Sequence, residues 1–322
     1  MESNIVFKNE PKLSEHEADS KFNERRIALI PQVEGFISSH KRFKGKETSV
    51  SFAHEGVSSL ICIIETQEEK LVLKIHLSIL RRTDEGQFLS VWEQAGVSVP
   101  HVLEEGTLNG HAYVLMDYID APLLGEKYSR EKLIDNGLHS EMGSILRKMH
   151  EPKGEGYGRL IDGKGEFSNF KDWLESEDMK NRFKYVKDNG VLGEEHGSLP
   201  LACKILLEYV GDKKSSYCHF DYGSKNIFAT NPITVFDPNP ELNNGYMDLA
   251  RSAVNSIAHD GKFPNQLIDG YFSNELYDKK ILQAAILVNS YYKFNYWHKT
   301  NKLKAIRNIQ EHLIKTKNII ED

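Results

Sequence analysis

Four polar side chains have the types and spacing that phosphoryl transfer requires. His219, Asp221 and Asn226 follow the pattern H-x-D-x-x-x-x-N, and Asp237 comes directly after the apolar run ITVF. In phosphoryl transfer from a nucleotide, one Asp faces the incoming hydroxyl, while an Asn and a second Asp hold magnesium against the phosphates. The pattern therefore predicts Asp221 as the catalytic residue and Asn226 and Asp237 as Mg²⁺ ligands. The structural alternatives are an Asx-turn at Asp221 and a left-handed loop residue at Asn226.

The order of the surrounding segments supports this chemistry. Residues 226–230 and 233–236 are predicted strands, and Asn231-Pro232 between them is a turn signal. Further on, Asp248-Leu249-Ala250 leads a predicted helix. A loop, a hairpin and a carboxylate at the end of the second strand thus occur in the order that a magnesium-dependent kinase needs.

This segment resembles the aminoglycoside phosphotransferase/choline kinase-like family, whose catalytic loop usually reads H-G-D-x-x-x-x-N and is followed by a metal Asp and a D-x-A helix. The run DYGSKN at 221–226 is most similar to hygromycin-type phosphotransferases. The resemblance covers residues 48–258. It implies an α+β, bilobal protein-kinase-like fold, with a small N-terminal lobe of antiparallel sheet plus helix and a larger, mainly helical C-terminal lobe.

We expect residues 1–117 to form a nucleotide-binding lobe and residues 118–322 to form the catalytic and substrate-binding lobe. Residues 1–44 are predicted to be a helical extension of the first lobe, with a helix over 22–36. Three strands are expected within 48–77, separated by turns at 54–58 and 66–69. A helix over 83–95 and a hairpin of 101–108 with 111–118, joined by Asn109-Gly110, complete this lobe.

One charged residue, Lys74, lies inside the third predicted strand. In kinases this position carries the lysine that grips the α- and β-phosphates, and the alternative is a solvent-facing lysine. The resemblance implies that Glu85 pairs with Lys74, with Glu93 as a less favoured partner; a helix-dipole role is the alternative for Glu85. The turn at 54–58 would cover the nucleotide phosphates, although it contains Gly56 and no G-x-G-x-x-G pattern.

The run 113–119 resembles the hinge between the lobes of the family. The resemblance implies that adenine binds the carbonyl of Asp117 and the amide of Ile119, and that Met116 packs against it. A core position is the alternative for Met116.

Beyond the hinge the sequence is mainly helical. Apolar residues from Leu138 to Met149 mark one buried helical face that ends at His150, followed by a Gly-rich connection at 154–165. Later helices are expected at 204–211, 252–259, 266–272, 279–297 and 302–320. The helix at 279–297 is unusually aromatic, and we favour core packing over a wall of the acceptor pocket.

Composition excludes several classes of protein. The 322 residues carry a formal net charge of -6, which argues against nucleic acid as a partner. No apolar stretch is long enough to span a membrane and no signal segment begins the chain, so a cytoplasmic location is expected. The oligomeric state is left open. Cys62, Cys203 and Cys218 are predicted to be buried small hydrophobes.

The predicted reaction moves the γ-phosphate of ATP or GTP, with Mg²⁺, to a hydroxyl of a small molecule. His219 is expected to brace the loop, and Pro238 after Asp237 departs from the family pattern. An aminoglycoside-type antibiotic is the favoured acceptor; choline, homoserine, sugar or fructosamine kinases are the alternative. A nucleotide-binding pseudokinase is a third hypothesis. The presence of all four predicted residues, Lys74, Asp221, Asn226 and Asp237, argues against it. Candidate acids for a pocket that binds a cation are Asp162, Glu166, Asp172, Glu175, Glu241 and Asp260.

Overall fold

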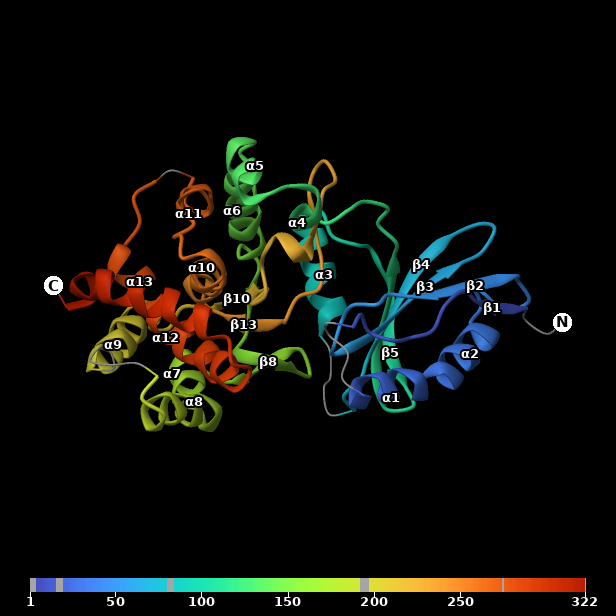
Figure 1. Ribbon diagram of the computed structural model, residues 1–322, viewed down its shortest axis with the longest axis horizontal. Helices are drawn as coiled ribbons and strands as arrows, with labels where there is room; N and C mark the ends of the chain where they lie inside the picture. The colour runs from blue at the N-terminus through green and yellow to red at the C-terminus, as the bar shows by residue number, and fades with distance from the viewer. Residues whose placement is uncertain (1–3, 16–19, 80–83, 192–196, 274, 322) are drawn as a thin grey trace. The chain divides into compact units, whose positions relative to one another are not determined.

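The computed structural model describes residues 4–15, 20–79, 84–191, 197–273 and 275–321. The chain divides into two compact units: Met1–Gln94 with Ser98–Ala121, and Ala95–Val97 with Pro122–Asp322. The first is built on a large sheet and the second is mainly helical, so the predicted α+β fold class is confirmed (Figure 1).

A six-stranded sheet in the order β1-β2-β3-β4-β6-β5 forms the first unit. The strands are β1 (Ile5–Phe7), β2 (Thr48–Phe52), β3 (Ser59–Glu65), β4 (Lys70–His76), β5 (Val102–Leu108) and β6 (His111–Asp117). Asn109 and Gly110 both have positive φ angles, 51° and 83°, as a tight two-residue turn between β5 and β6 requires. The sheet is antiparallel as predicted, except that β1 pairs in parallel with β2. The prediction missed β1 because three residues in a charged segment carry too little periodicity.

Among its described residues, the first unit has three helices: α1 (Ser20–Ala28), α2 (Ile30–Ser39) and α3 (Glu85–Gln94). The prediction of one helix over 22–36 was wrong, because Pro31 in the first turn of α2 starts a new helix after Leu29. Val33 and Ile37 of α2 are fully buried and pack in one core with the sheet. The expected start of α3 at Thr83 lies outside the described residues.

A buried arginine ties the amino-terminal extension to the turn between β2 and β3. Arg26 of α1 is fully buried, and its guanidinium donates hydrogen bonds to main-chain carbonyls, at 2.6 Å for Ser59 and 3.0 Å for Gly56. The accepting carbonyls belong to Pro11, Ala53, Glu55, Gly56 and Ser59. Because these bonds converge on one side chain, Arg26 fixes the turn that the sequence predicted to cover phosphates.

The second unit contains a small five-stranded sheet in the order β7-β10-β13-β8-β9 and a separate hairpin of β11 and β12. The strands are β7 (Lys153–Gly154), β8 (Tyr157–Ile161), β9 (Lys164–Phe167), β10 (Ser215–Cys218), β11 (Ile227–Phe228), β12 (Thr234–Val235) and β13 (Glu241–Asn243). The hairpin is the one predicted around Asn231-Pro232. The prediction of a plain Gly-rich connection at 154–165 was wrong, because this segment pairs with strands far along the chain.

Ten α-helices belong to the second unit in the described part of the chain. They are α4 (Leu124–Lys127), α5 (Arg130–Asp135), α6 (Leu138–Met149), α7 (Phe170–Leu174), α8 (Glu177–Asp188), α9 (Leu199–Val210), α10 (Gly245–Asp260), α11 (Asn265–Tyr271), α12 (Lys279–Lys299) and α13 (Leu303–Glu321). Of these, α6, α7 and α10 contact the five-stranded sheet. Figure 1 shows α12 and α13, in red, beside α10. Of the predicted buried cysteines, Cys62 and Cys218 are buried and Cys203 is half-buried. Among the described helices, none combines the length and apolar character needed to cross a bilayer.

Replacing Arg26 by Met should lower the free energy of unfolding by about 2–3 kcal/mol, because several buried carbonyls lose their donor. Chemical denaturation followed by circular dichroism measures this change. Arg25→Met is the matched control, since Arg25 is exposed on the same helix, and it should change stability by less than about 0.5 kcal/mol. Equal stabilities of the two variants would contradict the role given to Arg26.

Candidate active site

A buried carboxylate at the start of α10 holds the loop that carries Asp221. Asp248 is fully buried and accepts hydrogen bonds from the backbone N–H groups of His219, at 2.5 Å, and Phe220, at 2.8 Å. His150, directly after α6, donates from Nε2 to the same carboxylate at 3.0 Å. Burial tends to raise the pKa of Asp248, but the interactions with His150 and with His219 together outweigh it and hold that pKa below its ordinary value.

The sequence analysis assigned no role to Asp248 or His150. The D-L-A tripeptide at the start of α10 and the histidine at the end of α6 were both visible in the sequence, but their contact joins residues that are 98 positions apart. Asp248 therefore acts as the fixed point of the loop, because one carboxylate satisfies two consecutive amides that would otherwise be buried without acceptors.

His219 braces the same loop against the strand that precedes Asp237. Its Nδ1 accepts a hydrogen bond from the N–H of Asp221 at 3.2 Å, and its Nε2 donates to the carbonyl of Phe236 at 3.0 Å. This pair of bonds assigns the neutral tautomer with the proton on Nε2. The geometry thus gives His219 the bracing contact that was expected.

Asp221, Asn226 and Asp237 are brought together by short-range hydrogen bonds. The side-chain Nδ2 of Asn226 donates to the carbonyl of Asp221 at 2.8 Å and to its Oδ2 at 3.1 Å. The carbonyl of Asn226 accepts a hydrogen bond from the N–H of Phe236 at 3.1 Å. This bond holds the residue before Asp237 against Asn226. No described residue donates to Oδ1 of Asp221, and this side chain is exposed. One carboxylate oxygen is thus held in place and the other can face a substrate hydroxyl.

The oxygen atoms of this group fit a magnesium ion. Because both hydrogens of the Asn226 amide point toward Asp221, its Oδ1 is left as an acceptor, and no described residue donates to it. Asp237 is half-buried and has a left-handed backbone with φ of 52°, and Pro238 stiffens the next residue. Mg²⁺ prefers such hard oxygen ligands. One possible metal-ligand atom from each of His150, Cys218 and Asp248 also lies within 4.8 Å of the other two. These side chains already form hydrogen bonds within the protein, so we do not assign a metal to them.

Phe220 stands where the family usually has Gly, and its backbone is in the left-handed region with φ of 52°. A residue with a side chain pays about 1–2 kcal/mol for this conformation. Asp248 offsets this cost by accepting the Phe220 N–H, and the buried ring faces the guanidinium of Arg251 with the Cζ atom 5.3 Å from the ring centre.

In the first unit, Lys74 of β4 and Glu85 of α3 form a buried ion pair. The Lys74 Nζ atom lies 2.9 Å from Oε1 and 2.7 Å from Oε2 of Glu85, and 5% of Lys74 and 1% of Glu85 are exposed. Glu93, the less favoured partner, bonds His101 on the surface instead. Because Lys74 is buried, the alternative of a solvent-facing lysine is wrong.

The predicted adenine-binding residues lie at and after the end of β6 in the first unit. Met116 is buried within the strand, Asp117 is its last residue, and Ile119 follows as a half-buried residue. The N–H of Asp117 donates to the carbonyl of His101 at 3.0 Å. Gly56, in the predicted phosphate turn, has a φ of 90°, which explains a glycine there.

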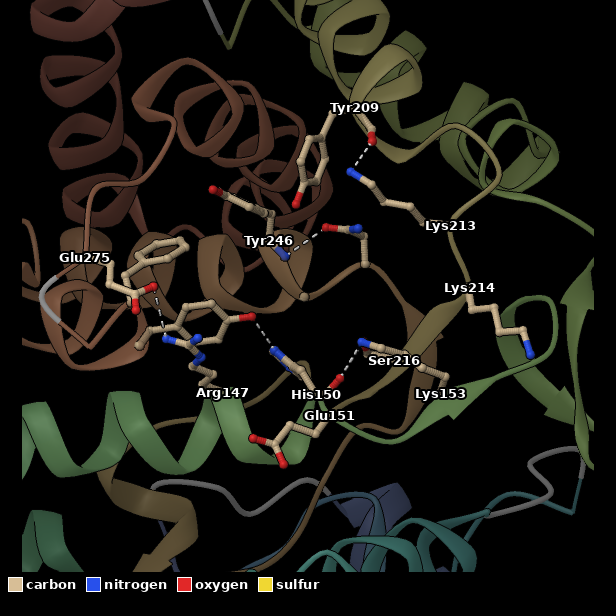
Figure 2. Close-up of a pocket in the computed structure, with 14 residues that line it drawn as sticks. Arg147, His150, Glu151, Lys153, Tyr209, Lys213, Lys214, Ser216, Tyr246 and Glu275 are labelled. Carbon is tan, nitrogen blue, oxygen red and sulfur yellow. Dashed lines mark hydrogen bonds and ion pairs between the residues drawn. The ribbon is translucent and has the colours of Figure 1, made fainter.

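His150 and its second hydrogen-bond partner, Tyr271, line a cavity of about 750 Å³ (Figure 2). Figure 2 shows the Tyr271 hydroxyl bonded to His150, at 2.8 Å from its Nδ1 atom. Tyr209, Tyr246 and Phe272 contribute aromatic walls, but Asp221, Asn226 and Asp237 do not line it. The cavity is therefore separate from the residues that carry the predicted chemistry.

Several solved structures are similar to this chain. A thermostable mutant of aminoglycoside phosphotransferase APH(4)-Ia, in ternary complex with AMP-PNP and hygromycin B, matches with a TM-score of 0.62 and 16% identity, over 90% of this chain and 98% of that chain. A candidate fructosamine-3-kinase from Haemophilus somnus matches with a TM-score of 0.55 and 14% identity, over 84% and 90%. Ethanolamine kinase from Plasmodium vivax matches with a TM-score of 0.52 and 10% identity, over 98% and 97%.

The chain therefore has the fold of the aminoglycoside phosphotransferase/choline kinase-like proteins, as the sequence resemblance predicts. No protein-family model and no curated protein sequence matches it. The identities of 10–16% show a shared fold, and function has to be argued from the site itself.

Replacing Asp248 by Asn should lower the free energy of unfolding at neutral pH by about 2–3 kcal/mol, because charge-assisted bonds become neutral ones. The folded-state pKa of Asp248 is lowered, so its contribution is present above the unfolded-state pKa and is lost as the pH falls through the folded-state pKa. The difference between wild type and variant should therefore shrink in acid.

Denaturant titrations at several pH values measure this effect. Asp260→Asn, at the other end of α10, is the matched control, because Asp260 pairs with Arg130 in a partly exposed position and should contribute less than about 1 kcal/mol. A pH-independent loss in Asp248→Asn would show that its charge is not what stabilises the loop.

Proposed function

We propose that the protein is a magnesium-dependent phosphotransferase that moves the γ-phosphate of ATP or GTP to a hydroxyl of a small molecule. The observation that carries this proposal is the fixed arrangement of Asp221, Asn226 and Asp237. Asp221 is held through one carboxylate oxygen while the other has no donor among the described residues, and Asn226, which holds it, pairs through its backbone with Phe236, the residue before Asp237. A binding module needs a nucleotide site, but it has no need for an oriented carboxylate at this position.

Each residue has a distinct role in the proposed reaction. Asp221 orients the acceptor hydroxyl and takes its proton as the oxygen attacks the γ-phosphorus. Asn226 and Asp237 would hold Mg²⁺, which neutralises the charge of the phosphates. His219 and Asp248 position the loop through its backbone. Such reactions depend on positioning and charge more than on covalent chemistry, so a rigid loop is a functional requirement.

The first unit supplies the proposed contacts to the nucleotide. The buried pair of Lys74 and Glu85 would direct the ammonium toward the α- and β-phosphates. The carbonyl of Asp117 and the amide of Ile119 would bind adenine, with Met116 against the ring. Similar structures support a nucleotide donor, since APH(4)-Ia has been crystallised with AMP-PNP and with ADP.

Similar structures include both antibiotic and metabolic kinases, so the fold supports a small-molecule acceptor without choosing one. An aminoglycoside would need unpaired acids near Asp221. Among the six candidate acids, Asp260 pairs with Arg130 and Glu166 lies 3.5 Å from Arg159. Two of the six candidate acids are thus already paired, and an acceptor assay has to choose between the antibiotic and the metabolic class.

Two substitutions separate catalysis from metal binding. Asp221→Asn should reduce turnover by about 10²–10⁴-fold while keeping magnesium-nucleotide affinity, because it removes the proton acceptor but not a ligand. Asp237→Asn, which tolerates the left-handed backbone, should weaken magnesium-dependent nucleotide binding by at least about tenfold. Calorimetric titration with AMP-PNP, with and without Mg²⁺, measures the affinities.

Asp188→Asn serves as a surface control, since Asp188 is exposed at the end of α8 and has no proposed role. Full turnover in Asp221→Asn would overturn the proposed mechanism. An unchanged magnesium dependence in Asp237→Asn would overturn the ligand assignment.

A further inference from the structure

The turn between β2 and β3 directs several of its carbonyl groups onto the buried guanidinium of Arg26. This arginine of α1 is fully buried, and its Nη atoms donate to the carbonyls of Ala53, Glu55, Gly56 and Ser59. Gly56 lies in the middle of the turn with φ of 90°, a conformation that residues with a side chain rarely adopt. One side chain from the amino-terminal extension therefore determines how the peptide groups of this turn are oriented.

The amides of the same peptide groups point away from Arg26. In a trans peptide the C=O and the following N–H lie on opposite sides, so the carbonyls of Glu55 and Gly56 determine where the amides of Gly56 and Val57 point. Neither amide donates a hydrogen bond to any residue that the structure describes, and both residues are partly exposed. Two successive unpaired amides in a turn form the kind of concave donor group that binds phosphate oxygens.

The charge of Arg26 strengthens these amides as hydrogen-bond donors. A carbonyl that accepts from a guanidinium is polarised, and the N–H of the same peptide group becomes a better donor. The bonds to the carbonyls of Gly56 and Ser59 are 3.0 and 2.6 Å long, and burial shields the guanidinium from water. The turn also contains one carboxylate, Glu55, which would repel a phosphate. Because Glu55 is exposed, solvent weakens that repulsion.

Further hydrogen bonds hold the turn against the amino-terminal extension. The N–H of Ser14 donates to the carbonyl of His54 at 2.7 Å, and the ring Nδ1 of His54 lies 3.0 Å from the carbonyl of Lys12. Arg26 joins the two segments, since its Nε donates to the carbonyl of Pro11 at 2.9 Å. The conformation of the turn thus depends on residues that precede the antiparallel strands.

We propose that Arg26 is a positioning residue for the nucleotide, because it orients the amides of Gly56 and Val57 as donors to a phosphate group. This inference rests on the proposed function, and it concerns a residue that lies before the segment that resembles the kinase family. Arg26 is buried and does not reach a ligand itself, so it acts through the backbone of the turn. Its bonds explain how a turn with one glycine and no G-x-G-x-x-G pattern can bind phosphate.

The test compares a nucleotide that has phosphates with a nucleoside that has none. Binding of AMP-PNP with Mg²⁺ depends on the turn, whereas binding of adenosine depends only on the proposed adenine contacts. In Arg26→Met we expect the Kd for AMP-PNP to rise by about tenfold or more, and the Kd for adenosine to stay within about twofold. Calorimetric titration measures both constants, at a temperature where circular dichroism shows each variant to be folded. A general loss of structure would raise both constants by the same factor.

Two further variants make the test independent of the folding of Arg26→Met. Arg26→Lys keeps the charge but supplies one donor nitrogen in place of three, and it should raise the Kd for AMP-PNP alone, by about threefold or more. Gly56→Ala leaves Arg26 in place, but its Cβ would meet Cδ1 of Ile61 at 3.1 Å and φ of 90° is unfavourable for alanine. The amides of the turn then have to move, so the same selective loss is expected.

Each variant has a matched control in the same unit. Arg25→Met changes an exposed arginine of α1, and Gly45→Ala changes a glycine with φ of 79° whose added Cβ would meet no described atom within 4 Å. Neither control should change the Kd for AMP-PNP or for adenosine.

The outcomes separate this inference from the proposed function. Equal changes of the two constants in both Arg26 variants, or no change in either constant, would overturn the positioning role and leave the proposed function standing. A wild-type protein that binds AMP-PNP with Mg²⁺ no more tightly than adenosine would likewise overturn the role of the turn. A wild-type protein that binds neither compound would overturn both.

Discussion

The contact of Asp248 with two consecutive backbone amides is the constraint on which the rest of the site depends. It turns the chain at Phe220, a position with a left-handed backbone, and so directs Asp221 away from the core. Because the carboxylate is buried and receives a third bond from His150, the turn is tied to α6 as well as to α10. The amide of Asn226 then bonds Asp221, and the hairpin carries Asp237 back to the same place. A small number of directional bonds thus positions a group of residues that must act together.

The helix that holds the loop contacts it through two side chains. Asp248 and Arg251 are three residues apart on α10, so they lie on neighbouring positions of one helical face. Asp248 fixes the backbone of the loop, and the guanidinium of Arg251 lies against the ring of Phe220 in the same loop. A fold shared with aminoglycoside kinases is compatible with a different acceptor, because specificity depends on side chains and not on the scaffold.

The parts that could be predicted from the sequence were those with local signals. Asn109-Gly110 identified a hairpin, helical periodicity located α6, and the spacing of His219, Asp221 and Asn226 indicated the loop. The parts that could not be predicted join distant segments. β7 to β9 are short and depend on pairing with strands such as β13, and Arg26 bonds carbonyls about thirty residues away. The contacts of Arg251 with Asn289 and Tyr292 likewise become visible only when α10 and α12 pack together.

Identifying the product of a phosphoryl transfer tests the central claim most directly. Wild-type protein and Asp221→Asn are incubated with Mg²⁺, ATP or GTP and a panel of hydroxyl compounds, and acceptor masses are recorded. The account predicts an acceptor whose mass increases by one phosphoryl group with wild type, and a loss of that product in Asp221→Asn. Nucleotide that binds with magnesium but is never transferred to any acceptor would contradict it and would favour a nucleotide-binding protein without catalysis.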